Sequence, residues 1–148
     1  MSNEQIDATR PEIRKRPKLV WIITMFYIIS AGWMLLSFAL IYSGAIPINE
    51  AQRAYFDSQN IFDIILTLSM ASLNVLGAIL LFLLKRHSFH CFLTAFSIGL
   101  FMTVYHILFK NWLAAIGGSG LVGAFIGWII SIAIILYSNK LIKSKILI

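Results

Sequence analysis

The sequence has few charged residues and a single cysteine, and each of these features excludes a class of protein. Only 12% of the 148 residues are charged and 59% are hydrophobic, whereas soluble domains are about 25% charged and about 45–50% apolar. A soluble chain of this length has too much surface for its volume to hide so much apolar area. The lone cysteine, Cys91, excludes an internal disulfide and the thiol chemistry of cysteine pairs. We therefore expect an integral membrane protein.

Four apolar runs are each near the length of about 20 residues that crosses a bilayer. They cover about residues 19–42, 61–84, 88–109 and 112–137, and the glycine-rich stretch at 117–120 leaves open whether the last span begins at 112 or at 119. Backbone polar groups must be paired in lipid, so each run should be helical. The predicted fold class is an all-α integral membrane protein with four transmembrane helices in an antiparallel up-down bundle over residues 19–137. A disordered basic tail (1–18) and a second basic tail (138–148) flank it.

The basic residues are distributed unequally between the two sides of these spans. Ten of the 12 lysines and arginines precede the first span, lie between the second and third, or follow the fourth. Only Arg53 and Lys110 fall on the other side. The positive-inside rule therefore places both termini in the cytoplasm and the loop 43–60 outside. We expect the first span to be retained, because its apolar run is longer than that of a cleaved signal peptide.

The same distribution bears on partners and location. The basic residues lie outside the apolar runs and not along one folded face, so the expected partner is the lipid bilayer and not nucleic acid. No Asn-x-Ser/Thr sequon occurs in the sequence, which favours the inner (plasma) membrane of a bacterium. Within the outer loop, Asn49 and Gln52 have the spacing of a capping box. They predict a short amphipathic helix on the outer membrane surface.

Small residues recur every four positions in the last two spans, which predicts helix contacts there. The expected packing residues are Ala95 and Gly99 in the third span, and Ser119, Gly123, Gly127 and Ser131 in the fourth. We expect these two stripes to pack against each other as a hairpin. The alternative is that Gly123 and Gly127 face another membrane protein or a second copy of the chain, giving a homo-oligomer.

Three polar side chains inside the spans are candidates for a membrane site. Asn74 lies near the middle of the second span and should hydrogen-bond across a helix interface, because an unpaired amide is costly in lipid. Its alternative role is to line a substrate path. Asp63 and His106 lie near the outer ends of the second and third spans, at similar depth. They form a candidate outward-facing proton or cation site, unless headgroup water solvates each of them separately.

No catalytic, metal or cofactor site is predicted. His87, His90 and Cys91 share a helical face, but no further ligands complete a metal site. His90 and His106 are separated by about 24 Å along a helix, which argues against a haem bound between them. The sequence contains neither a Gly-Lys-Ser/Thr phosphate loop nor a Gly-x-Ser-x-Gly nucleophile elbow.

One short segment, Glu50-Ala51-Gln52-Arg53-Ala54, resembles the Glu/Arg stretch of the membrane-associated glutathione-transferase family. That family is also small, basic and four-spanning, so the resemblance implies a conjugating membrane enzyme. It covers less than a tenth of the chain. The asparagine and glutamate that follow in the family are out of register here, and the predicted orientation is opposite.

These observations leave three hypotheses about function. The first is a non-catalytic accessory, assembly or regulatory subunit that acts through helix packing and its outer loop. The second is a small oligomeric transporter or channel with Asn74, Asp63 and His106 along its path. The third, more distant, is a glutathione-transferase-like enzyme.

Overall fold

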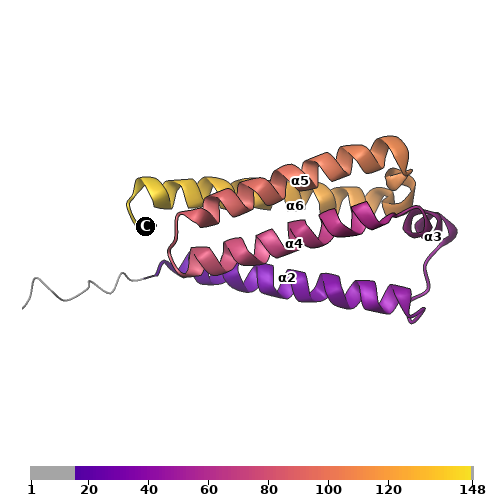
Figure 1. The fold of residues 1–148 in the computed structure, drawn as a ribbon, viewed down its shortest axis with the longest axis horizontal. Coiled ribbons are helices and arrows are strands. Elements are labelled where there is room, and N and C mark those ends of the chain that lie inside the picture. Colours follow the sequence, from indigo (N-terminus) through magenta and orange to yellow (C-terminus); the bar gives the residue numbers. More distant parts are fainter. Residues whose placement is uncertain (1–15, 148) are drawn as a thin grey trace, which may run out of the picture.

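The computed structural model describes residues 16–147, which contain five helices and no strands (Figure 1). The helices are α2 (Lys18–Tyr42), α3 (Glu50–Asp57), α4 (Ile61–Phe82), α5 (His87–Phe109) and α6 (Trp112–Lys143). All but α3 are long and apolar enough to cross a membrane, so the prediction of four helices with the length and composition of membrane spans is confirmed. Of the predicted tail 1–18, residues 1–15 lie outside the described residues, and Lys18 already begins α2.

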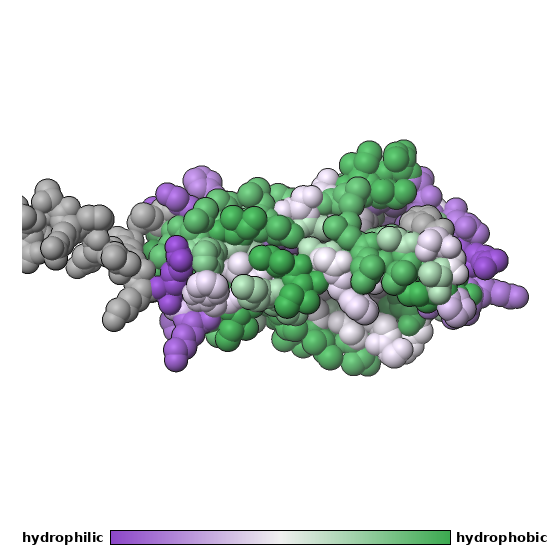
Figure 2. Space-filling view, turned by 90° about the horizontal axis from the view of Figure 1, so that it is seen from below, coloured by the Kyte–Doolittle hydropathy of each residue, from purple (hydrophilic) through white to green (hydrophobic). Residues whose placement is uncertain are grey.

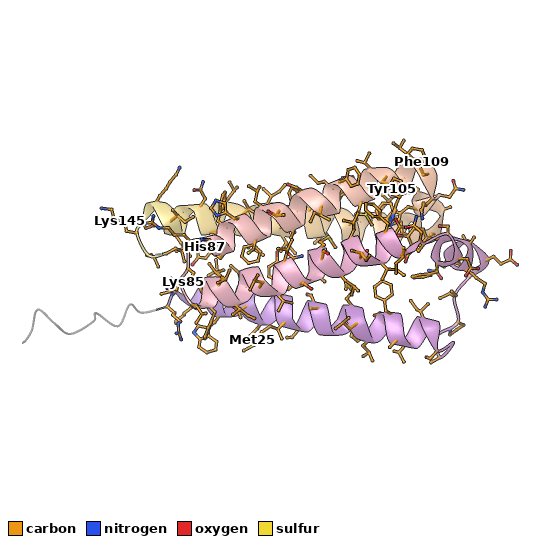
Figure 3. The ribbon with its side chains drawn as sticks, viewed as in Figure 1. Met25, Lys85, His87, Tyr105, Phe109 and Lys145 are labelled. Atoms are coloured by element: carbon orange, nitrogen blue, oxygen red, sulfur yellow. The ribbon has the colours of Figure 1, made fainter. Side chains whose placement is uncertain are left out.

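The four long helices lie side by side, and α3 sits at one end of them, next to the start of α6 (Figure 1). We call this the α3 end. The start of α2, the α4–α5 loop and the end of α6 meet at the opposite end, where Figure 3 shows Lys85 and Lys145. We call that the basic end. Apolar side chains cover much of the surface between two hydrophilic ends (Figure 2).

The hydrophobic core lies toward the basic end. It is built from all four long helices and includes the buried residues Val20, Tyr27, Leu81, Phe92 and Leu141. The Tyr27 ring stacks on Phe92 with a centroid distance of 5.1 Å, and the Thr24 hydroxyl donates to the Ala78 carbonyl at 3.2 Å, joining α2 to α4. Tight packing therefore holds the helices together at this end.

The most extensive helix contact joins α4 to α5, whereas the small-residue stripes predict a hairpin of α5 and α6. Gly77, which is buried in α4, makes the close approach possible: a Cβ atom there would lie 2.9 Å from the Phe92 ring and 3.2 Å from Cys91 Cβ. Helices α5 and α6 also touch, but Gly123 has no atom within 4 Å of the position that a Cβ would take. A Cβ at Gly99 of α5 would likewise lie 3.0 Å from Met70 Sδ of α4, so a glycine on each helix allows this pair to approach closely.

Helix α6 is interrupted at one glycine and extends further than predicted. Gly117 has φ 62° and ψ −172°, a conformation that breaks the helix within the expected glycine-rich stretch. Beyond it the helix runs through residues 138–143, which the sequence assigns to a tail. No proline or glycine follows Gly127, and Lys140 and Lys143 occupy the last turn, where the helix dipole favours positive charge.

The short helix α3 begins as predicted. The Asn49 side chain accepts from the Gln52 backbone N–H at 2.8 Å, and the Gln52 side chain accepts from the Asn49 N–H at 3.1 Å. The capping box is therefore confirmed. It fixes the start of α3 and so positions Tyr55, which lies within this helix.

Candidate functional site

Asp63 is the centre of a polar cluster at the α3 end. It lies in the first turn of α4 and is only 1% exposed. Its carboxylate accepts from the Asn60 backbone N–H at 2.9 Å, and the Asn60 side chain accepts from the Asp63 N–H at 3.0 Å. This second capping box holds the carboxylate at the helix start. The Asn60-x-x-Asp63 spacing is the sequence signal that would have revealed it.

Lys110, at the end of α5, is the charge partner of Asp63. Its Nζ atom lies 2.5 Å from Asp63 Oδ2, and the lysine side chain is only 7% exposed. The same ammonium group donates to the Ser58 carbonyl. The sequence did not single out Lys110 as a site residue, although its i, i+4 spacing from His106 places both on one face of α5.

His106 joins this ion pair to α3. Its Nε2 atom lies 3.4 Å from Asp63 Oδ1, and its Nδ1 atom forms a 2.9 Å hydrogen bond with the Tyr55 hydroxyl. The structure thus brings the predicted residues Asp63 and His106 together and adds Tyr55, which the sequence did not single out. Burial raises the pKa of the Tyr55 phenol above its ordinary value, so the phenol keeps its proton at neutral pH.

Tyr55, Asp63, His106 and Lys110 form what we call the outer polar cluster. Each of the four side chains has a hydrogen-bond partner among the described residues, and Asp63 and Lys110 form an ion pair. The cluster ties α3, α4 and α5 together at one end of the molecule. Its polar groups bond to one another, and these bonds hold the three helices together.

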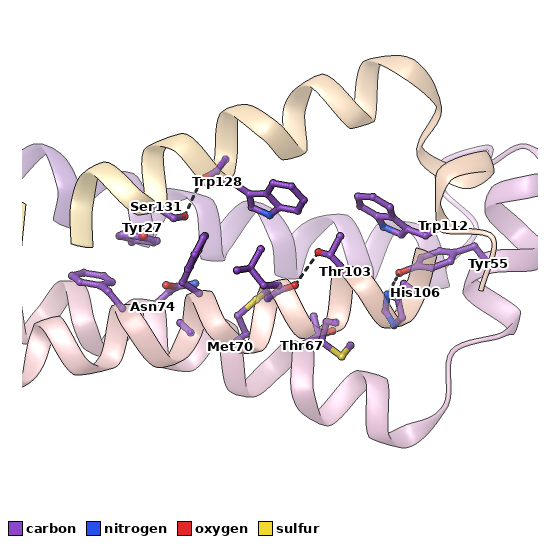
Figure 4. Close-up of a pocket in the computed structure, with 17 residues that line it drawn as sticks. Tyr27, Tyr55, Thr67, Met70, Asn74, Thr103, His106, Trp112, Trp128 and Ser131 are labelled. Carbon is purple, nitrogen blue, oxygen red and sulfur yellow. Dashed lines mark hydrogen bonds between the residues drawn. The ribbon is translucent and has the colours of Figure 1, made fainter. Parts of the chain in front are cut away.

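A cavity of about 340 Å³ lies between the outer polar cluster and the hydrophobic core (Figure 4). Asn74 and His106 line it, whereas Asp63 does not. Asn74 and Asp63 are 11 residues apart on α4, which corresponds to about 16 Å along the helix. The three predicted membrane-site residues are therefore not in one place: Asp63 and His106 are paired, and Asn74 lies deeper along the cavity.

Most of the predicted packing residues lie around this same cavity. Ala95 and Gly99 of α5 and Gly127 and Ser131 of α6 line it. The Ser131 hydroxyl is used within its own helix, where it donates to the Gly127 carbonyl at 2.9 Å. The two remaining packing residues, Ser119 and Gly123, are exposed and do not line the cavity.

The other candidate features lie away from the cavity. Within residues 16–147, no group of three or more His, Cys, Asp or Glu side chains is close enough to hold a metal ion. Glu50 and Arg53, which carry the resemblance to the glutathione-transferase family, are exposed on α3. Neither lines the cavity.

Comparisons of the chain with protein-family models, with curated proteins and with solved structures found no match.

Proposed function

We propose that this chain is a multi-pass protein of a bacterial inner membrane, an antiparallel bundle with both termini in the cytoplasm. Helix α4, with 22 residues, is about 33 Å long, which matches a hydrocarbon core of about 30 Å. Lys85, Arg86, Lys140 and Lys143 belong to the basic end, and Arg53 belongs to α3. The positive-inside rule puts the basic end in the cytoplasm.

Single-cysteine variants test this orientation. In a Cys91→Ala background, we expect Arg53→Cys to react with a membrane-impermeant maleimide in intact spheroplasts, because Arg53 is exposed on the outer helix. We expect Lys143→Cys to react only after the membrane is permeabilised. Labelling of both cysteines from the same side would contradict the proposed topology.

Within this architecture we propose a non-catalytic role, as an accessory, assembly or regulatory subunit. The observation that carries the proposal is the sparsely packed α6: its apolar stretch has the smallest buried share of the four spanning helices, and Gly123 has no neighbour within 4 Å of its Cβ position. Glycines four residues apart allow close approach of another helix in lipid. The four side chains of the outer polar cluster all bond to one another, which supports the same role.

Purification in a mild detergent tests the accessory role with a matched pair of variants. We expect the wild type to co-purify with a second membrane protein or a second copy, and Gly123→Leu to reduce its recovery by about tenfold or more. Gly32→Leu is the control, because Gly32 also has nothing within 4 Å of its Cβ position but lies on α2. Equal recovery with both variants, or a monomer in every preparation, would contradict docking on α6.

A small oligomeric transporter or channel is the second candidate, because the cavity contains Asn74 and its outer limit is His106, which is bonded to Asp63. Proteoliposomes that contain the purified chain separate this role from the first. A proton or cation flux that falls in Asp63→Asn vesicles is the result expected of a transporter. Absence of flux in the wild type argues against it.

The glutathione-transferase-like enzyme is the distant third alternative. It has only the short resemblance of residues 50–54 in its favour, and the exposed positions of Glu50 and Arg53 add nothing to it. Absence of glutathione binding by the purified protein would remove it.

A further inference from the structure

The cavity is an elongated space that extends from the hydrophobic core to the outer polar cluster. Tyr27 and Phe92 of the hydrophobic core line its inner end, and Tyr55 and His106 of the outer polar cluster line its outer end. Phe92 and His106 are 14 residues apart on α5, about 21 Å along the helix. Its volume of about 340 Å³ falls within the range of about 300–1,000 Å³ that is typical of small-molecule sites. The space is therefore large enough for a ligand.

The lining selects an uncharged ligand. No aspartate, glutamate, lysine or arginine is among the described residues that line the cavity. Its polar groups are hydroxyls, the Asn74 amide, the His106 imidazole and the indole N–H groups of Trp112 and Trp128. A charged molecule would lose its hydration there without meeting an opposite charge, which is costly. A neutral molecule avoids this cost.

Several hydrogen-bonding groups in the cavity are unused. Within the described part of the chain, the Asn74 amide and the indole N–H groups of Trp112 and Trp128 have no hydrogen-bond partner. An amide offers two donors and an acceptor, and each indole offers one donor. Figure 4 shows Asn74, Thr103 and Trp128 around the same space. Donors predominate among these groups, so the matching ligand carries acceptor oxygens.

The walls of the cavity favour a flat ring. Phe92, Phe96, Trp112 and Trp128 supply aromatic surfaces, and Met70 supplies an adaptable thioether. Rings stack on such surfaces in offset or edge-on arrangements. An acyl chain would fill the volume but would leave the Asn74 amide without a partner, at the cost of an unpaired polar group in apolar surroundings.

We propose that this cavity binds a neutral, membrane-dissolved molecule whose flat ring carries carbonyl oxygens, the chemistry of a quinone. The Asn74 amide and the Trp128 N–H donate to the carbonyl oxygens, and the aromatic walls hold the ring. The proposal concerns binding only, and it does not depend on the docking of a partner on α6.

Tryptophan fluorescence tests the proposal on the purified full-length chain. Titration with a short-chain benzoquinone should quench the fluorescence saturably, because Trp112 and Trp128 line the cavity. Trp33, which is 70% exposed and outside the lining, is replaced by Phe in every sample to reduce quenching by quinone dissolved in the detergent. Linear, unsaturable quenching would overturn the proposal.

Two glycines of α6 provide a matched comparison. Gly127 lines the cavity and Gly123 does not, yet neither has an atom within 4 Å of its Cβ position. We expect Gly127→Leu and Asn74→Leu to raise the Kd for the quinone by about tenfold or more, and Gly123→Leu to leave it unchanged. Gly127→Ala adds only a methyl group to open space, so it should raise the Kd less than Gly127→Leu does. It keeps the test informative if the leucine variant misfolds.

The result that would overturn the proposal is the same Kd in all of these variants, or organic extraction of the native protein that yields phospholipid only. A loss of partner recovery in Gly123→Leu with unchanged quinone binding would support both proposals independently. Unchanged partner recovery would remove the docking proposal and leave the quinone proposal standing.

Discussion

Asp63→Asn is expected to lower the free energy of unfolding by about 3–5 kcal/mol, the usual cost of removing one partner from a buried ion pair. Asparagine keeps the shape of the side chain and an oxygen that can accept from the Asn60 N–H. It removes the negative charge that lies 2.5 Å from the Lys110 ammonium. Lys110, with a side chain only 7% exposed, would then be a buried cation without a counter-charge.

Thermal or SDS-induced unfolding of the purified protein in detergent measures this effect. Asp57→Asn is the control, because Asp57 is an exposed carboxylate on α3, and its replacement should change stability little. The double variant Asp63→Asn/Lys110→Met removes the unpaired cation as well, so it should recover much of the lost free energy of unfolding. A double-mutant cycle would report this recovery as coupling. An Asp63→Asn protein as stable as Asp57→Asn would show that solvent reaches Lys110.

Gly77→Ala is expected to destabilise the protein by about 1–3 kcal/mol through overpacking. In an open helix position the same change would increase stability by about 1 kcal/mol, because alanine is the better helix former. At Gly77 the new methyl group would lie 2.9 Å from Phe92 Cε1 and 3.2 Å from Cys91 Cβ. The Phe92 ring is buried and stacked on Tyr27, so it has little room to move away.

Gly32→Ala provides the comparison, since a Cβ at Gly32 has nothing within 4 Å and the gain in helix propensity is the same. We expect Gly32→Ala to unfold at the wild-type temperature or above it, and Gly77→Ala to unfold below it. Gly77→Ala/Phe92→Leu should recover part of the loss by making room for the methyl group. Equal stability of the two alanine variants would mean that α4 and α5 do not approach as closely as described.

Local features of the fold could be predicted from the sequence. The four apolar runs correspond to the four long helices because a chain in lipid must pair its own backbone groups. The capping box of Asn49 and Gln52 depends on residues three positions apart, so the sequence alone reveals it. The break at Gly117 was also foreseeable, because glycine tolerates a positive φ.

Which helices and side chains meet was decided only by the tertiary structure. Asp63 pairs with Lys110 across 47 residues, and Tyr55 reaches His106 across 51. Most of the predicted small residues of α5 and α6 line a cavity, while Gly77 and Gly99 form the close contacts between α4 and α5. Hydropathy does not reveal this, because lipid is as apolar as a helix interface and a spanning helix is apolar on every side. The rotation of each helix is therefore set by steric fit and by a few polar pairs, which exist only once the helices are side by side.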